Sequence, residues 1–264
     1  MRLFYRRLIL LFFIFTFFIS GSFLIFFGSG YQWDWGKRKI IKRGSILIES
    51  KPKEVLIYLN KNLYGEKTTP ILINLLPNEY LVEIKKEGYH PWKKTLNVES
   101  KKVTFAQNIL LFPKNPSFEI LKETEKIFTE STKIDLSYLN LKEDFEKKLK
   151  TETKGFLLSP DEKNLLWWND FELWIFSLEK EKEEILARYS KKIEDALWHP
   201  SSAHVIFTFS DSIRVIEIDN RSGKNVVELI KTEKIDDLLM IKRGVLYFKV
   251  RIKGEEKTLK MKIQ

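Results

Sequence analysis

The chain contains no cysteine among its 264 residues, which excludes disulfides, thiolate metal sites and cysteine nucleophiles. Histidine is scarce as well, because only His90, His199 and His204 occur, and neither of the last two has an acidic neighbour. The sequence also lacks a HExxH zinc motif, a GxSxG serine elbow, a Walker phosphate loop, a dinucleotide glycine fingerprint and an EF-hand pattern. We therefore expect no metal site, no cofactor and no catalytic residue.

Acidic residues are outnumbered by basic ones, 36 against 46, and the formal net charge is +10. Such a balance favours contact with anionic lipid headgroups, an acidic envelope polymer or nucleic acid, and charge alone does not choose among them. Hydrophobic residues make up 44% of the chain, which is enough for ordinary cores in one large domain or two small ones.

An uncharged apolar run extends from Leu8 to Phe27. As a helix it would span about 30 Å, the thickness of the hydrocarbon core of a bilayer. We predict a transmembrane helix over residues 8–28, preceded by a cytoplasmic tail of residues 1–7. Basic and aromatic side chains beside the run are the expected membrane-interface residues, namely Arg6, Arg7, Tyr31, Trp33 and Trp35.

Cleavage and orientation of this segment are open questions. Ser20-Gly21-Ser22 offers small residues to a signal peptidase, but apolar character resumes at Phe23, which favours retention. Basic residues flank both ends of the run, in the tail and in the juxtamembrane segment 29–43. Because the tail arginines abut the apolar run, we favour a single-pass topology with extracytoplasmic C-terminal domains.

Residues 44–111 alternate between apolar and polar positions with period two, as in Ile46–Ile48 and in Tyr80–Val82–Ile84. Glycine, proline and asparagine fall between these short runs, as expected for turns. The pattern predicts a small antiparallel β-sandwich.

The same region resembles the PEGA domain. The matching positions are Pro52, Gly65, Thr69-Pro70, Leu76-Pro77, Tyr80 and Gly88-Tyr89, whereas Glu54-Val55 replaces the eponymous Gly-Ala and Asn62 and Asn78 replace glycines. Asparagine tolerates positive φ well, so we expect both asparagines to preserve their turns. The resemblance implies a surface-exposed, membrane-tethered module without a shared catalytic residue. Tyr80 and Tyr89 are then packing residues, and His90 is an extended loop residue before Pro91.

Residues 112–155 are predicted to be a linker. The stretch FPKNP at its start is stiff and disfavours a strand. Further on, KEDFEKKLK can form a short helix with Phe145 and Leu149 on one face.

Residues 156–264 contain an internal repeat with an offset of forty. It pairs Pro160 with Pro200 and Trp167 with Phe207, a period typical of four-stranded propeller blades. The turn SPDEK followed by ELWIFSL resembles the TolB-like family of propeller repeats, with Glu162 where that family prefers glycine. A third unit begins near Asp237 without the proline turn.

Three units are fewer than a closed propeller uses. We therefore expect either a degenerate extra blade from residues 117–155 or an open, partial propeller-like domain. The predicted fold class is mainly β: an N-terminal transmembrane helix, a small antiparallel PEGA-like β-sandwich, and a partial β-propeller-like domain.

Aromatic residues are the best candidates for partner binding, because adjacent residues of a strand face opposite sides and one of Trp167 and Trp168 should then point outward. The alternative is that they pack against a neighbouring blade or against the first β-domain. The candidate partner-binding set is Trp167, Trp168, Trp174 and Trp198.

The sequence favours a non-catalytic, membrane-anchored surface protein of a bacterial envelope, whose partners are the lipid bilayer and either an envelope polymer or another surface protein. A second interpretation is an envelope hydrolase or transferase that uses turn carboxylates, drawn from Asp161, Asp170, Asp195 and Asp211. A third reverses the topology and places a basic domain against nucleic acid in the cytoplasm, and we rank it below the other two.

Overall fold

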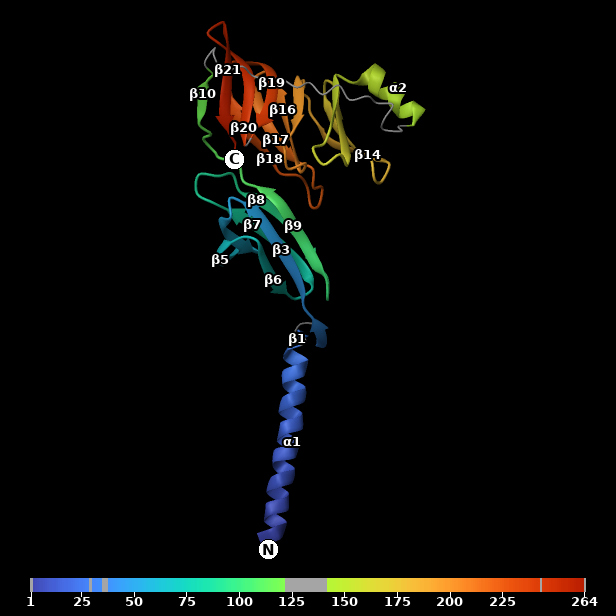
Figure 1. Ribbon diagram of the computed structural model, residues 1–264, viewed down its shortest axis with the longest axis vertical. Coiled ribbons are helices and arrows are strands. Elements are labelled where there is room, and N and C mark those ends of the chain that lie inside the picture. The colour runs from blue at the N-terminus through green and yellow to red at the C-terminus, as the bar shows by residue number, and fades with distance from the viewer. Residues whose placement is uncertain (1, 29, 35–37, 122–141, 243, 264) are drawn as a thin grey trace.

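The computed structural model describes residues 2–28, 30–34, 38–121, 142–242 and 244–263. Three parts follow one another along its long axis: an N-terminal helix, a small β-sandwich and a domain of three β-sheets (Figure 1). Strands dominate, as the sequence predicts, and among the described residues the sheets do not close into a barrel or a propeller.

Helix α1 (Arg2–Gly28) carries the apolar run and extends back through the predicted tail. Its segment Phe4–Phe26 is 23 residues long, or about 34 Å, and none of it is buried within the protein. By length and composition it can cross a membrane, and it is the one helix among the described residues that can.

A hairpin of β1 (Tyr31–Asp34) and β2 (Lys39–Lys42) joins α1 to the sandwich. The Tyr31 ring stacks on Phe26 with centroids 5.2 Å apart, and the Lys42 ammonium lies 5.4 Å from the Tyr31 centroid. These contacts tie the hairpin to the end of the helix.

The sandwich contains two sheets, ordered β6-β3-β9 and β5-β4-β7-β8. Its strands are β3 (Gly44–Lys51), β4 (Glu54–Leu59), β5 (Asn62–Thr68), β6 (Ile71–Leu75), β7 (Asn78–Lys85), β8 (Trp92–Val98) and β9 (Val103–Leu110). Inward-facing Ile46, Ile48, Ile57 and Ile84 form the centre of the core. The sandwich is antiparallel, as predicted, except that β3 and β9 pair in parallel.

Two turn predictions need correction. Positive φ in the β4–β5 turn falls on Asn60 (52°) and Lys61 (70°), whereas Asn62 and Asn78 are the first residues of β5 and β7 and have no positive φ. The strand register therefore places the left-handed positions of the β4–β5 turn just before Asn62, earlier than the family pattern suggested. Tyr80 is a packing residue as expected, and its hydroxyl donates to the Leu76 carbonyl at 2.9 Å.

Three four-stranded antiparallel sheets form the C-terminal domain. The first contains β11 (Gly155–Leu158), β12 (Asn164–Trp168), β13 (Glu172–Ser177) and β14 (Lys182–Arg188). The second contains β15 (Asp195–Trp198), β16 (His204–Phe209), β17 (Ser212–Glu217) and β18 (Val226–Lys231). The third contains β19 (Lys234–Lys242), β20 (Val245–Ile252), β21 (Glu255–Lys262) and, as its outer strand, β10 (Phe118–Ile120).

The first two sheets repeat one another in backbone detail. Positive φ occurs at Glu162 (59°) and at Ser202 (56°), forty residues apart. The third strand of each sheet has a register shift at equivalent positions, between Leu173 and Trp174 and between Ile213 and Arg214. The sequence repeat is thus a structural repeat.

Residues 117–155 do not form an extra blade in the part that the structure describes. Residues 118–120 join the third sheet as β10, and α2 (Glu143–Glu152) covers the outer face of the first sheet. Phe145 and Leu149 of α2 lie on one face, as predicted, and pack there with Leu165 and Trp167.

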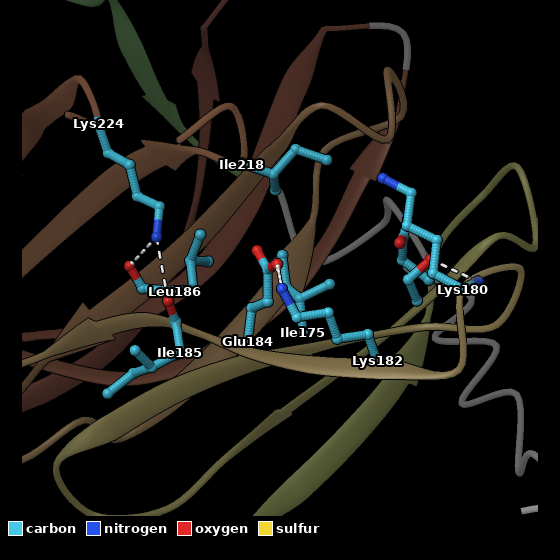
Figure 2. A pocket seen from close by; sticks show the side chains of 10 residues that line it. Ile175, Lys180, Lys182, Glu184, Ile185, Leu186, Ile218 and Lys224 are labelled. Atoms are coloured by element: carbon cyan, nitrogen blue, oxygen red, sulfur yellow. Dashed lines mark hydrogen bonds and ion pairs between the residues drawn. The ribbon is translucent and has the colours of Figure 1, made fainter. Parts of the chain in front are cut away.

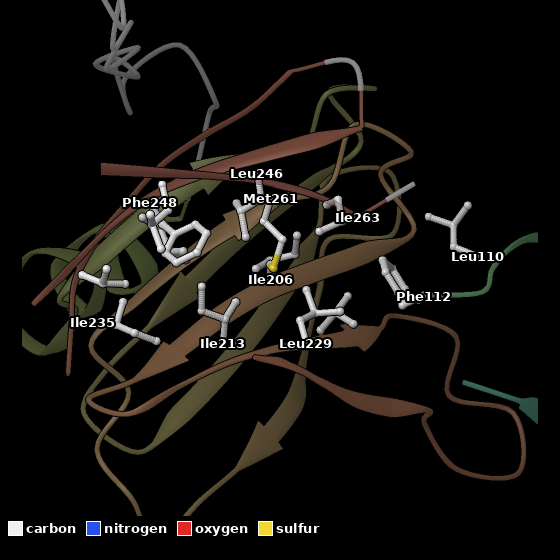
Figure 3. Close-up of a cluster of buried hydrophobic side chains, with 14 residues drawn as sticks. Leu110, Phe112, Ile206, Ile213, Leu229, Ile235, Leu246, Phe248, Met261 and Ile263 are labelled. Carbon is white, nitrogen blue, oxygen red and sulfur yellow. The ribbon is translucent and has the colours of Figure 1, made fainter. Parts of the chain in front are cut away.

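The predicted linker begins inside the core of the C-terminal domain. Leu110 and Phe112 are buried members of the cluster that includes Ile206, Ile213, Leu229 and Met261, and they lie at one end of it (Figure 3). The sandwich and the three-sheet domain therefore share apolar packing at their junction.

Polar contacts add to this junction between the two β-domains. We call the junction, formed by Leu110, Phe112, Trp92, Lys94 and Glu217, the joint. The Lys94 side chain is 0% exposed, and its Nζ donates to Glu217 Oε1 at 2.6 Å and to the carbonyls of Asp219 (2.6 Å) and Gly223 (2.8 Å). Trp92 Nε1 donates to the other oxygen of Glu217 at 2.8 Å. All three ammonium hydrogens of Lys94 thus have acceptors, which a buried cation requires.

Candidate functional site

The four candidate tryptophans lie in the first two sheets, on two different faces. Trp167 and Trp174 stack in parallel, with centroids 5.3 Å apart, beneath α2. Lys148 of α2 places its ammonium 4.8 Å from both centroids and 3.1 Å from Glu183, which accepts a hydrogen bond from Trp167 Nε1. This pair fixes the helix to the sheet.

Trp168 and Trp198 pack between the first and second sheets, and Trp198 Nε1 donates to the Leu157 carbonyl at 2.9 Å. The expectation that one of Trp167 and Trp168 points outward is wrong: the two rings do take opposite faces, but both are buried. The reason is α2, which covers the face that the strand pattern alone leaves exposed. Trp168 and Trp198 match the alternative of packing against the neighbouring sheet, whereas Trp167 packs under α2, which neither interpretation expected.

A groove of about 150 Å³ opens between the first two sheets (Figure 2). Its apolar floor combines Ile175 of β13 and Leu186 of β14 with Ile218, which follows β17. Lysines stand around this floor: Lys180 and Lys182 come from the β13–β14 hairpin and Lys224 comes from the turn before β18.

The groove charges are only partly balanced. Lys182 Nζ bonds Glu184 at 2.7 Å, and this hydrogen bond holds the pKa of the Glu184 carboxyl below its usual range. Lys224 Nζ donates to the carbonyls of Ile185 (3.1 Å) and Leu186 (2.7 Å) on the free edge of β14. Burial lowers the pKa of Lys224, and the Glu184 carboxylate opposes that shift.

Three lysines and one glutamate leave the groove with a net positive charge beside an aliphatic floor. Such a site suits a ligand that joins a small apolar group to a carboxylate or a phosphate. Sequence reasoning missed this groove, because its residues come from a hairpin and a turn that meet only through sheet packing. The one available signal was the highly charged stretch KEKEE after β13, which carries two of the three groove lysines.

The turn aspartates each have a local role. Asp161 accepts from Ser159 Oγ at 2.6 Å, Asp170 bonds Lys154 at 3.0 Å, and Asp211 pairs with Lys191. Asp195 differs from the other three because it is more deeply buried. Burial raises its pKa to about 6, although the backbone amides of Ala196 and Leu238 donate hydrogen bonds to its carboxylate.

All three histidines lie at the joint between the β-domains. Phe112 packs edge-on against His199 and His204, with centroids 6.3 Å and 5.6 Å away, and His90 shares a small cavity with Phe112 and His204. Burial lowers the pKa of His199 to about 4 and that of His204 to about 3. Among the described residues, no group of three or more histidines and carboxylates is placed to hold a metal ion.

The predicted membrane-interface residues lie around α1. Arg6 and Arg7 are exposed within its first turns, Trp33 is exposed on β1, and Tyr31 is half-buried against Phe26. Trp35 lies outside the described residues.

Residues 43–111 match the family model of the PEGA domain, and this range coincides with the β3–β9 sandwich. The sandwich is therefore a PEGA domain within a longer chain. A comparison of the chain with curated proteins finds no match.

Proposed function

We propose that this protein is a non-catalytic, membrane-anchored surface protein that binds an envelope polymer or another surface protein through its three-sheet domain. The observation that carries the proposal is the buried joint. Because Lys94, Glu217 and Phe112 couple the PEGA domain to the three-sheet domain, the two act as one arm on α1. Such an arm holds a binding surface at a set height above a membrane.

Retention of α1 and an extracytoplasmic orientation are part of this proposal. Support comes from the length of the apolar helix, from the aromatic hairpin stacked on its end, and from the surface or periplasmic setting in which PEGA domains are often found. We also propose that the three sheets are blades of an open propeller-like array, supported by the forty-residue structural repeat.

Within this function, the basic groove is the proposed contact site. Its positive charge suits the carboxylate or phosphate groups of an envelope polymer, and its aliphatic floor adds apolar contact. An acidic segment of a surface protein also offers carboxylates for the lysines and apolar side chains for the floor.

Binding is tested with the full chain in nanodiscs and two probes, a soluble phosphate-bearing polymer and a polyglutamate. Lys180→Glu/Lys182→Glu should lower affinity roughly tenfold or more, because about 1.4 kcal/mol of attraction is lost. The matched control, Lys253→Glu/Lys257→Glu in the β20–β21 hairpin of the third sheet, makes the same change in net charge at residues that do not line the groove. Equal losses in both variants would show non-specific charge attraction and contradict a groove site.

Topology is tested separately by adding protease to intact cells that express the full chain. Our proposal expects degradation of residues 44–264 without cell lysis. Protection of that region would contradict the orientation and leave the cytoplasmic interpretation standing.

A further inference from the structure

The outer face of the sheet β6-β3-β9 of the PEGA domain carries a row of apolar side chains. Leu72 and Phe105 are 52% and 53% exposed, and half-buried Leu47 lies between them. The strand register aligns the three, because Leu47 pairs with Leu72 of β6 and with Phe105 of β9. Val103, 42% exposed, adds an apolar side chain on β9 alone, beside Ser45 of β3.

Polar pairs border this apolar row on both sides along the strands. On the side toward the β1–β2 hairpin, Ser45 Oγ donates to Asn74 Oδ1 at 2.6 Å. On the side away from that hairpin, Gln107 Nε2 donates to Glu49 Oε2 at 3.4 Å. An exposed apolar centre with a polar border is the usual anatomy of a protein contact surface.

We propose that a second copy of this chain covers the row, with Leu47 on the two-fold axis. Two chains anchored in one bilayer insert in the same direction, so a symmetric pair must have its axis along the membrane normal. Strands β3 and β9 run roughly along the long axis of the molecule and therefore roughly along that axis (Figure 1).

This symmetry makes the row complementary to itself. A two-fold axis parallel to the central strand β3, in front of the sheet, places β3 opposite β3 of the second copy and β9 opposite β6. Because Leu72, Leu47 and Phe105 lie at one height, Leu47 meets Leu47 and each Phe105 meets a Leu72. Aligned sheets that pack face to face in this way lie about 10 Å apart.

The size of the row sets the strength of the contact. Four side chains fall well short of the roughly 800 Å² per partner that stable interfaces bury, so the pair is weak in solution. Anchoring in the same membrane raises the effective concentration and orients the domains, which populates a weak contact without new interactions. The inference thus rests on the proposed retention of α1, and it is independent of the groove.

The absence of native cysteine allows a direct test. The full chain carrying Leu47→Cys is reconstituted in lipid vesicles and treated with a bis-maleimide that spans about 10 Å. The control is Leu63→Cys on β5, which is also an exposed leucine of this domain. We expect roughly tenfold more crosslinked dimer for the Leu47→Cys variant than for the control.

A second change tests the row itself. In the Leu47→Cys background, Phe105→Glu should reduce crosslinking to the level of the Leu63→Cys control. The change places one carboxylate of each copy against Leu72 of the other copy, where burying it is unfavourable. Tyr64→Glu, a charge placed on exposed β5, should leave crosslinking unchanged. Circular dichroism of each variant confirms that the domain is folded.

Equal crosslinking of the Leu47→Cys and Leu63→Cys variants would overturn the inference. If the thiol of the Leu47→Cys variant then resists a water-soluble maleimide, lipid covers the row; if it reacts, the row is open to a different protein. Reconstitution imposes the anchoring, so this failure is distinguishable from a failure of the proposed topology.

Discussion

Lys94 is a buried cation whose acceptors all come from the other domain. Replacing it with methionine keeps the apolar stem but leaves the Glu217 carboxylate 6% exposed and without its cation. We expect Lys94→Met to lower the free energy of unfolding by about 3–5 kcal/mol, the typical cost of breaking a buried ion pair. Urea unfolding of the full chain in detergent measures this change.

The double variant Lys94→Met/Glu217→Gln supplies the control for that loss. Removing both charges removes the uncompensated carboxylate, so stability should recover by more than half. No recovery would show that the loss comes from the carbonyls of Asp219 and Gly223, which lose their donor in both variants, and not from the Glu217 carboxylate.

Gly155 lies so close to the Trp168 ring that no larger side chain fits. A Cβ built on Gly155 would lie 2.4 Å from the Trp168 ring, and φ at this residue is not positive, so the requirement is space. Gly155→Ala should therefore cost about 1–3 kcal/mol, as overpacking does. In a Trp168→Phe background, which removes the contacted indole atoms Cζ2, Cη2 and Cε2, the same change should cost almost nothing, as thermal unfolding can show.

At the scale of elements, the joint couples stability to pH through its histidines. The pKa values of His199 and His204 are about 4 and about 3 in the folded state and near 6.5 in the unfolded chain. The unfolded state therefore binds more protons, and stability that is complete above pH 6.5 falls as pH drops toward 4 and 3. Each histidine accounts for about 2 kcal/mol of loss by pH 5.

Asp195 opposes part of that loss. Its folded pKa of about 6 is above the ordinary value of 3.8, so its contribution improves as pH falls through 6. His204→Phe should flatten the dependence of stability on pH between 7 and 5, whereas Asp195→Asn should steepen it. Urea midpoints measured at half-unit intervals test both, and an unchanged slope in His204→Phe would contradict the assignment.

The elements that sequence could predict are those with a local pattern. Period-two alternation indicated the sandwich strands, the forty-residue offset indicated the first two sheets, and Phe145 with Leu149 indicated α2. Strand β10 has three residues and pairs Phe118 with Met261, so its place depends on a contact between distant segments. The groove and the joint were missed for the same reason. The expected outward position of one of Trp167 and Trp168 was wrong because α2 covers Trp167 from outside its own sheet.

At the scale of the whole molecule, the joint predicts an arm without a hinge between its β-domains. Spin labels at Leu63→Cys and Lys192→Cys report on the PEGA domain and on the far end of the three-sheet domain, respectively. Pulsed electron paramagnetic resonance should give one narrow distance distribution. Adding Lys94→Met should broaden it, and an already broad distribution in the parent would contradict a rigid arm.

The position of β10 also affects how the protein is made. The outer strand of the third sheet leaves the ribosome before the first two sheets, whereas β21, its pairing partner, is translated after all the other described strands. The PEGA domain can fold early, but the apolar side chains around Phe112 and Ile206 wait for Phe248 and Met261 to cover them. We expect a chain truncated before β21 to leave these apolar side chains exposed to water, which makes it prone to aggregation and proteolysis.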